Sequence, residues 1–399
     1  MKFQSLLSPS NRTCWIKPGL ILLAGLILAA SPAPAQSEKA DKASRKLREI
    51  NQGATYERSR KQFYTKKWDL SGLPEYTPQA QVVGTIRIAR DCYLTAARVM
   101  PLWAEGFRKY QPLVNFEYVD ERLQTGRIDI VQNRRWTFDE FQDYQNRYHH
   151  YPLELEMATG SFNVPGWSPA FTILVNKENP ITQLTLKQLD GMFGGPRTGG
   201  WDGTFWRTDL ARGPEGNIRT WGQVGLTGKW KDAPVNVYGR ALKMHIQLYF
   251  ERKVFQGGSI WNENLREFAH QLNPDGTRTR MSPLMVSAVG KDPYGIVYND
   301  AGNQTIEGVK AVALAKDEGG PYVEVSLESV HDRTYPLFLE VYLYTHRNPD
   351  AKIREFLRYA LSREGQEAIQ QDGKWLPLTA DVAQEQLKKL SQSSVPANP

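Results

Sequence analysis

The stretch FTILVNK (171–177) constrains the fold of this chain more than any other part of its sequence. Its first five residues are apolar except for one threonine, and charged residues flank the run only on its C-terminal side. A nearly continuous apolar run of this length is expected of a strand buried on both faces of a sheet, as in α/β proteins. This stretch therefore predicts a strand in the interior of a layered fold.

The rest of the chain alternates strand-like with helix-like segments. Further strands are predicted at 83–89, 114–120, 127–133, 153–159, 235–239, 294–299, 309–315 and 341–347. Apolar residues at helical spacing follow the first of them from Val99 to Tyr110, with a loop expected at 89–98. A short helix at 184–193 opens at Thr185, and one long helix is expected from 350 until Gly373 stops it. Such alternation predicts an α/β fold with mostly parallel sheets.

Residues 1–35 have the features of an export signal. Lys2, Arg12 and Lys17 accompany the apolar run at 19–30, and Ala33 and Ala35 form a small-x-small pattern that predicts cleavage after residue 35. The apolar run is too short for a membrane span of ordinary length, although an uncleaved anchor is the alternative. Cleavage would remove Cys14, which also lacks the context of a lipidated cysteine, and leave Cys92 without an intrachain partner. We therefore expect an exported protein with no lipid anchor, in the periplasm.

The charge of the chain is unevenly distributed. The formal net charge is +7, of which three units lie in the signal segment, so the remaining surplus is too small to indicate nucleic-acid binding. Residues 36–67 carry ten Lys or Arg against four acids. We expect a solvated, partly helical extension there, with contact to an anionic lipid or a partner as the alternative. A Pro-containing linker is expected at 71–81.

Searches for catalytic and metal-binding motifs find nothing that predicts an enzyme. No H-E-x-x-H, C-x-x-C or G-x-S-x-G pattern occurs, and Trp230 stands where a phosphate loop needs Ser or Thr. His149 and His150 are adjacent and point different ways, so we expect no metal and no cofactor. Four tryptophans in the Gly-rich stretch 194–236 leave open a glycan-binding surface; the alternative is that they anchor the loops. They are Trp201, Trp206, Trp221 and Trp230.

Several segments in the same order resemble the periplasmic phosphate-binding proteins that serve ABC importers. They are FTILVNKENPITQLTLKQLDGMFGG (171–195), TWGQVGLTGKWKDAPVNVYGR (220–240), YGIVYN and LSREGQEAIQQDGKWLPLT (361–379). The resemblance spans about residues 82–390. It implies the type II two-lobed α/β fold, in which two crossover strands join lobes that close on a ligand like a hinged trap.

On this resemblance the chain divides as follows. The signal peptide (1–35) and the extension with its linker (36–80) precede lobe I, which takes residues 81–174 and 336–390. Lobe II would occupy 175–335, and a tail would follow at 391–399. We expect a monomer.

The ligand loops depart from the family pattern. Arg240 is retained, but Met244, His245 and Ile246 replace an expected Ser-Gly-Thr cluster, while Asp120 and Glu121 would repel an anion. The candidate ligand-binding residues are therefore mostly cationic: Arg240, His245, Lys243, Arg134, Arg135, Tyr93 and Thr95. The acids at 91, 120 and 121 could equally pair with the arginines and fill the site with salt bridges.

Three functions follow from these observations. The first is a non-catalytic solute-binding protein that captures phosphate or a larger anion and presents it to an ABC permease. The second is a descendant that has lost ligand binding and works as a periplasmic interaction or sensing module. The third is a glycan-binding protein.

Overall fold

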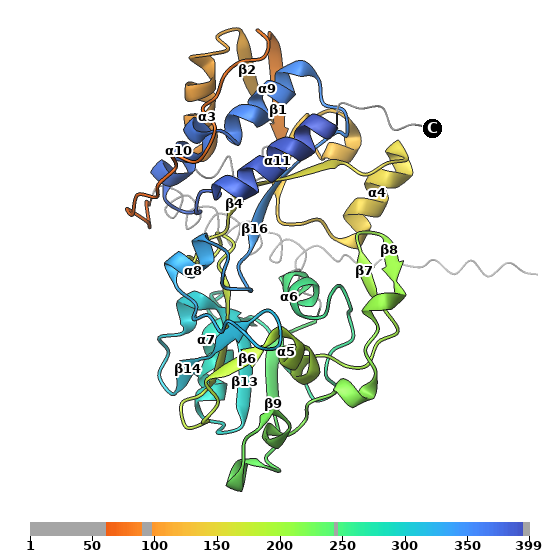
Figure 1. The fold of residues 1–399 in the computed structure, drawn as a ribbon, viewed down its shortest axis with the longest axis vertical. Coiled ribbons are helices and arrows are strands. Elements are labelled where there is room, and N and C mark those ends of the chain that lie inside the picture. Colours follow the sequence, from red (N-terminus) through yellow and green to blue (C-terminus); the bar gives the residue numbers. More distant parts are fainter. Residues whose placement is uncertain (1–60, 90–97, 243–245, 394–399) are drawn as a thin grey trace, which may run out of the picture. The chain divides into compact units, whose positions relative to one another are not determined.

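A computed structural model describes residues 61–89, 98–242 and 246–393. Within them the chain builds two five-stranded mixed sheets, each covered by helices (Figure 1). The chain passes from the first sheet to the second between β4 and β5, and it returns between α8 and β16. We call each sheet with its own helices a lobe.

The first lobe is built on the sheet with strand order β2-β1-β3-β16-β4. Its strands are β1 (Gly84–Ala89), β2 (Val114–Val119), β3 (Ile130–Asn133), β4 (Leu153–Thr159) and β16 (Glu340–Thr345). Its helices are α3 (Val99–Arg108), α4 (Phe138–Tyr148), α9 (Ala351–Ala360), α10 (Arg363–Asp372) and α11 (Ala380–Gln392). One hydrophobic cluster, including Ile86, Trp103, Phe107 and Phe356, packs the sheet against α3 and α9.

The second lobe is built on the sheet with strand order β10-β9-β13-β5-β14. Its strands are β5 (Phe171–Asn176), β9 (Asn236–Arg240), β10 (Arg266–Phe268), β13 (Gly295–Asp300) and β14 (Val309–Ala311). Its helices are α5 (Leu186–Phe193), α6 (Gln247–Val254), α7 (Met281–Gly290) and α8 (Leu327–His331). Three short pairs complete the strands: β6 (Gln183–Thr185) with β15 (Ala313–Ala315), β7 (Gly200–Asp202) with β8 (Phe205–Arg207), and β11 (Gln271–Leu272) with β12 (Arg278–Thr279).

Strand β5 confirms the expectation for the FTILVNK stretch, because all six of its residues are buried. All of its pairs lie in the second sheet, so the lobe boundary expected at 174/175 falls inside this strand. The expectation of mostly parallel sheets was wrong, since β5 is antiparallel to β13 and β14, and β16 is antiparallel to β3 and β4. Both strands come directly from the other lobe rather than through a crossover helix of their own lobe, so they run against their neighbours.

Capping residues set the ends of two predicted helices. The capping box of Thr185 with Gln188 opens α5 as expected. The long C-terminal helix is instead two helices, α9 and α10, because Ser362 is extended and its hydroxyl caps the second one. Gly373 ends α10 in the left-handed conformation, as expected (φ 65°).

The segment 61–76 packs on the folded body. Leu70, Leu73 and Tyr76 are buried in the core of the first lobe, although 71–81 was expected to be a linker. Upstream, the N–H groups of Phe63 and Tyr64 donate to the carbonyl of Gly373, and Trp68 stacks on His331 of α8, with ring centroids 3.6 Å apart. This stretch therefore contacts elements of both lobes.

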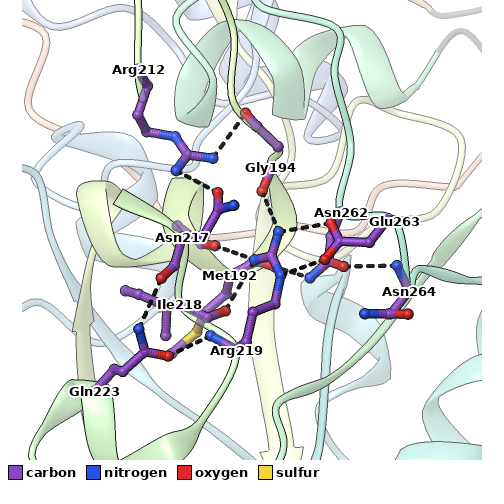
Figure 2. A network of polar contacts seen from close by, with 12 residues as sticks. Met192, Gly194, Arg212, Asn217, Ile218, Arg219, Gln223, Asn262, Glu263 and Asn264 are labelled. Carbon is purple, nitrogen blue, oxygen red and sulfur yellow. Dashed lines mark hydrogen bonds and ion pairs between the residues drawn. The ribbon is translucent and has the colours of Figure 1, made fainter. Parts of the chain in front are cut away.

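The Gly-rich stretch between α5 and β9 is held by a network of polar contacts (Figure 2). Arg219 donates to both carboxylate oxygens of Glu263 and to the carbonyls of Gly191, Gly194 and Ile218. Each nitrogen of this guanidinium thus has an acceptor. Trp221 is fully buried and also anchors the stretch, as the structural interpretation of the tryptophans expected.

Candidate functional site

Four of the predicted ligand-binding residues, Tyr93, Thr95, Lys243 and His245, lie outside the described residues. The site can therefore be built from Arg240, Arg134 and Arg135 and from the side chains around them. All three follow or end a strand, where functional residues of α/β proteins gather.

Arg240 is the last residue of β9, and its side chain is only 5% exposed. Its Nη2 donates to Oδ1 of Asp300 at 2.9 Å and approaches Oδ1 of Asn299 at 3.5 Å. Because β13 runs parallel to β9, Asp300 ends its strand at the same edge of the sheet. The Nε of Arg240 is buried and has no acceptor among the described residues.

Arg134 lies beside the start of α4. Its Nη1 donates to Oε2 of Glu140 at 3.0 Å. The same carboxylate accepts from the backbone N–H of Thr137, which caps the helix. This ion pair ties Arg134 to a local capping structure.

Arg135 faces Glu154 of β4, with Nε 3.6 Å from the carboxylate oxygen Oε1, and its backbone N–H donates to the Tyr249 hydroxyl on α6. Burial lowers the pKa of the guanidinium, but Glu154 and the neighbouring tyrosines raise it by more. Arg252, one turn further along α6, donates to the carbonyl of Trp136. Burial and the nearby Arg135 lower the pKa of Arg252.

Asp120 and Glu121 lie on a cavity of about 580 Å³ in the first lobe, together with Arg122, Glu140 and Asp143. Glu121 pairs with Arg127 at 2.6 Å. Neither of these two acids is paired with the predicted arginines in any contact that the structure shows. The carboxylates within ion-pair range of the arginines include Asp300, Glu140, Glu154 and, at 4.0 Å, Asp202.

These partners, and Arg252, were not predicted from the sequence. Asp300 directly follows the buried run YGIVYN, so the rule that charged residues at strand ends are functional could have found it. Glu154 alternates with apolar residues on β4 like any solvent-facing strand residue, and Arg252 lies in an ordinary amphipathic helix. Neither has a local signal.

Neither a metal-binding group nor a membrane-spanning helix is found among the described residues. Among residues 61–89, 98–242 and 246–393, no group of three or more His, Cys, Asp or Glu side chains is arranged to hold a metal ion. In the same part of the chain no helix is both long and apolar enough to cross a membrane. For the glycan hypothesis, Trp221 and Trp230 are buried, while Trp201 and Trp206 are 40% and 45% exposed.

Two α/β lobes joined by two chain crossings form the architecture of two-lobed solute-binding proteins. A family model described as "PBP superfamily domain" matches residues 79–364, and the chain belongs to this superfamily. It is a family of solute-binding proteins and not an enzyme family.

Among individual proteins, the phosphate-binding protein PstS of Pseudomonas aeruginosa is 28% identical over 331 residues, which cover 80% of this chain and 90% of the relative. Among solved structures, PstS from Borrelia burgdorferi is 14% identical with a TM-score of 0.45, covering 74% of this chain and 99% of that one. An ABC-type phosphate transport receptor from Vibrio cholerae is 19% identical with a TM-score of 0.42, covering 73% and 99%.

Proposed function

We propose that this protein is an exported, non-catalytic solute-binding protein that captures phosphate or another anionic solute and presents it to an ABC importer from the periplasm. Its membership of the PBP superfamily and its similarity to the phosphate-binding protein PstS support this function. Closure of the two lobes around the solute would be the mechanism.

The observation that carries the proposal is the incomplete hydrogen bonding of the Arg240 guanidinium. A guanidinium offers five N–H donors in a planar fork that suits oxyanions. Asp300 and Asn299 engage its Nη2, while its buried Nε has no acceptor among the described residues. Leaving such a donor unsatisfied is unfavourable, so an oxyanion at this strand edge would gain from it.

Around Arg240 the proposed ligand-binding residues remain Arg134, Arg135, Lys243, His245, Tyr93 and Thr95. Arg134 and Arg135 each have a carboxylate nearby. An anionic solute would compete with these carboxylates, and this competition would favour a solute of high charge or with several oxygens.

Isothermal titration calorimetry with phosphate, sulfate, phosphonates, phosphate esters and small carboxylates tests the function. Replacing Arg240 alone would leave Asp300 buried without its cation, at a cost of about 3–5 kcal/mol in the free energy of unfolding. The informative comparison is therefore Asp300→Asn with the double variant Arg240→Gln/Asp300→Asn. We expect the first to bind its solute and the second to lose about 10-fold or more in affinity, the effect of about one charge-assisted hydrogen bond.

Arg219→Gln serves as the matched control, because Arg219 is a satisfied arginine of the same lobe (Figure 2). It should bind with the affinity of the parent. Equal binding by the double variant and the parent would show that Arg240 is not a ligand-binding residue.

A second function has one specific observation in its favour. The three predicted arginines that the structure describes all have carboxylates of the chain itself within 4 Å. A site neutralised in this way suits a descendant that binds no solute and acts as an interaction or sensing module. It predicts no heat of binding with any solute of the panel, and a protein partner that is lost when residues 36–60 are deleted.

A further inference from the structure

Two arginines of the second lobe show how a shielded guanidinium is satisfied in the described part of the chain. Arg219 is the clearest case, with five hydrogen bonds to one carboxylate and three carbonyls (Figure 2). The side chain of Arg197, 4% exposed, likewise donates to both oxygens of Asp190 and to the carbonyl of Leu210. An arginine that departs from this pattern calls for an explanation, since a buried donor without an acceptor is unfavourable.

Five arginines of the described residues depart from it, each with one buried nitrogen that has no acceptor: Arg135, Arg212, Arg240, Arg252 and Arg333. Of these, Arg135 and Arg252 lie next to each other. The Nε of Arg135 and the Nη1 of Arg252 are buried, and neither has an acceptor in the described part of the chain. The Nε of Arg135 is 3.6 Å from Glu154, which is within ion-pair range but too long for a hydrogen bond.

The two arginines are neighbours although they belong to different lobes. Arg252, on α6, donates from Nη2 to the carbonyl of Trp136, the residue that follows Arg135. In return, the backbone N–H of Arg135 donates to the hydroxyl of Tyr249, three residues before Arg252 on the same helix.

The carboxylates near Arg135 and Arg252 do not neutralise the two positive charges. Glu154 is the nearest carboxylate, and its Oε2 already accepts from the hydroxyl of Tyr344 at 2.6 Å. Asp202 is 4.0 Å from Arg135, and its side chain is 60% exposed, so water screens it. Tyr342 and Tyr344 favour the charged guanidinium only when they are themselves ionised, and burial raises their pKa well above the ordinary value, so they carry no charge near neutral pH. Two partly buried cations therefore share one engaged carboxylate.

We propose that Arg135 and Arg252 form a two-arginine site for an oxyanion group, that is, a phosphate, sulfate or carboxylate. The oxyanion accepts from the Nε of Arg135 and the Nη1 of Arg252 and supplies the missing negative charge. The inference rests on the proposed function and deepens it, because it assigns Arg252 of α6 as a second residue that holds the anionic group of the solute.

A consequence for closure follows. The two guanidiniums repel each other, and an anion between them converts the repulsion into a bridge. Since one arginine comes from each lobe, the bridge forms only while the lobes are together. The oxyanion thus stabilises the closed arrangement through these two side chains.

The test measures binding of inorganic phosphate, sulfate and acetate by titration calorimetry, at constant ionic strength with chloride as the reference anion. The variants are Arg135→Gln and Arg252→Gln, with Arg219→Gln as the satisfied-arginine control. We expect at least one probe to bind the parent and to bind each of the first two variants about 10-fold or more weakly, and the control to match the parent. The rise in Tm caused by the oxyanion is measured for each variant against itself, so a general loss of stability cancels.

The outcomes separate this inference from the proposed function. Oxyanion binding that survives in Arg135→Gln and Arg252→Gln but disappears in Arg240→Gln/Asp300→Asn overturns the two-arginine site and leaves solute capture standing. Binding that depends on Arg135 and Arg252, without any decrease in the radius of gyration by small-angle scattering, supports the two-arginine site but overturns capture by lobe closure, together with the stabilisation of the closed arrangement by the anion. If none of the three probes binds the parent, the two-arginine site is overturned, whereas capture is decided by the wider solute panel.

Discussion

Glu251, which precedes Arg252 on α6, makes stability depend on pH in a way that can be calculated. Burial raises the pKa of this carboxyl from 4.5 to about 7, while the Trp261 indole N–H, 2.6 Å away, and Arg252 oppose the rise only in part. Each pKa unit corresponds to about 1.4 kcal/mol, so the rise of about 2.5 units means that the charged form costs the folded state about 3–4 kcal/mol.

The direction follows from the raised pKa. Between pH 4.5 and about 7 the folded protein holds more protons on Glu251 than the unfolded chain does, so the free energy of unfolding falls as the pH rises through this window. Below the window the group has no effect, and above it the full penalty is present. Glu251→Gln keeps an oxygen for the indole and removes the charge, so the variant should become more stable than the parent as the pH rises from 5 to 8.

Urea unfolding at pH 5, 6, 7 and 8 measures the difference between variant and parent, in which other titrating groups cancel. Glu263→Gln is a control of opposite sign, because the hydrogen bond from Arg219 lowers the pKa of Glu263. That variant should be less stable than its parent near neutral pH and approach it in acid. A difference between Glu251→Gln and the parent that stays constant from pH 5 to 8 would refute the reasoning.

Two further substitutions test a buried ion pair of the second lobe and the contact between Gly373 and Tyr64. Asp190→Asn removes the charge from a carboxylate whose side chain is 8% exposed and which pairs with Arg197 at 2.7 Å, so urea unfolding should show a loss of about 3–5 kcal/mol. Gly373→Ala should lower the thermal midpoint by several degrees, because the residue has a φ of 65° and an added Cβ would lie 2.5 Å from the carbonyl oxygen of Tyr64.

Much of the fold could be predicted because its signals are local. The continuous apolar run of β5 and the capping pair of Thr185 with Gln188 each act within a few residues. The antiparallel entry of β5 and β16 could not be read this way, since it depends on which lobe the chain comes from. The division of the C-terminal helix at Ser362 was missed because the apolar stripe continues across the break.

The site was predictable to a lesser degree. Arg240 could be proposed as a ligand-binding residue because a cation ends a strand in a recognisable segment, but its partner Asp300 lies 60 residues later in the sequence. The proximity of Arg135 and Arg252 depends on the packing of α6 against the residues that follow β3. No pattern along the chain encodes such a contact between distant segments.

Trp68 contacts one helix of each lobe. Its backbone N–H donates to Gln370 of α10 in the first lobe, while its ring stacks on His331 of α8 in the second at an interplanar angle of 11°. Trp68 therefore holds α8 and α10 together at this point, and the two helices separate here only if the stack or the hydrogen bond breaks. The family match, which begins at residue 79, excludes Trp68. A protein trimmed to that match would lose this link between the two helices, together with Leu70, Leu73 and Tyr76 of the core of the first lobe.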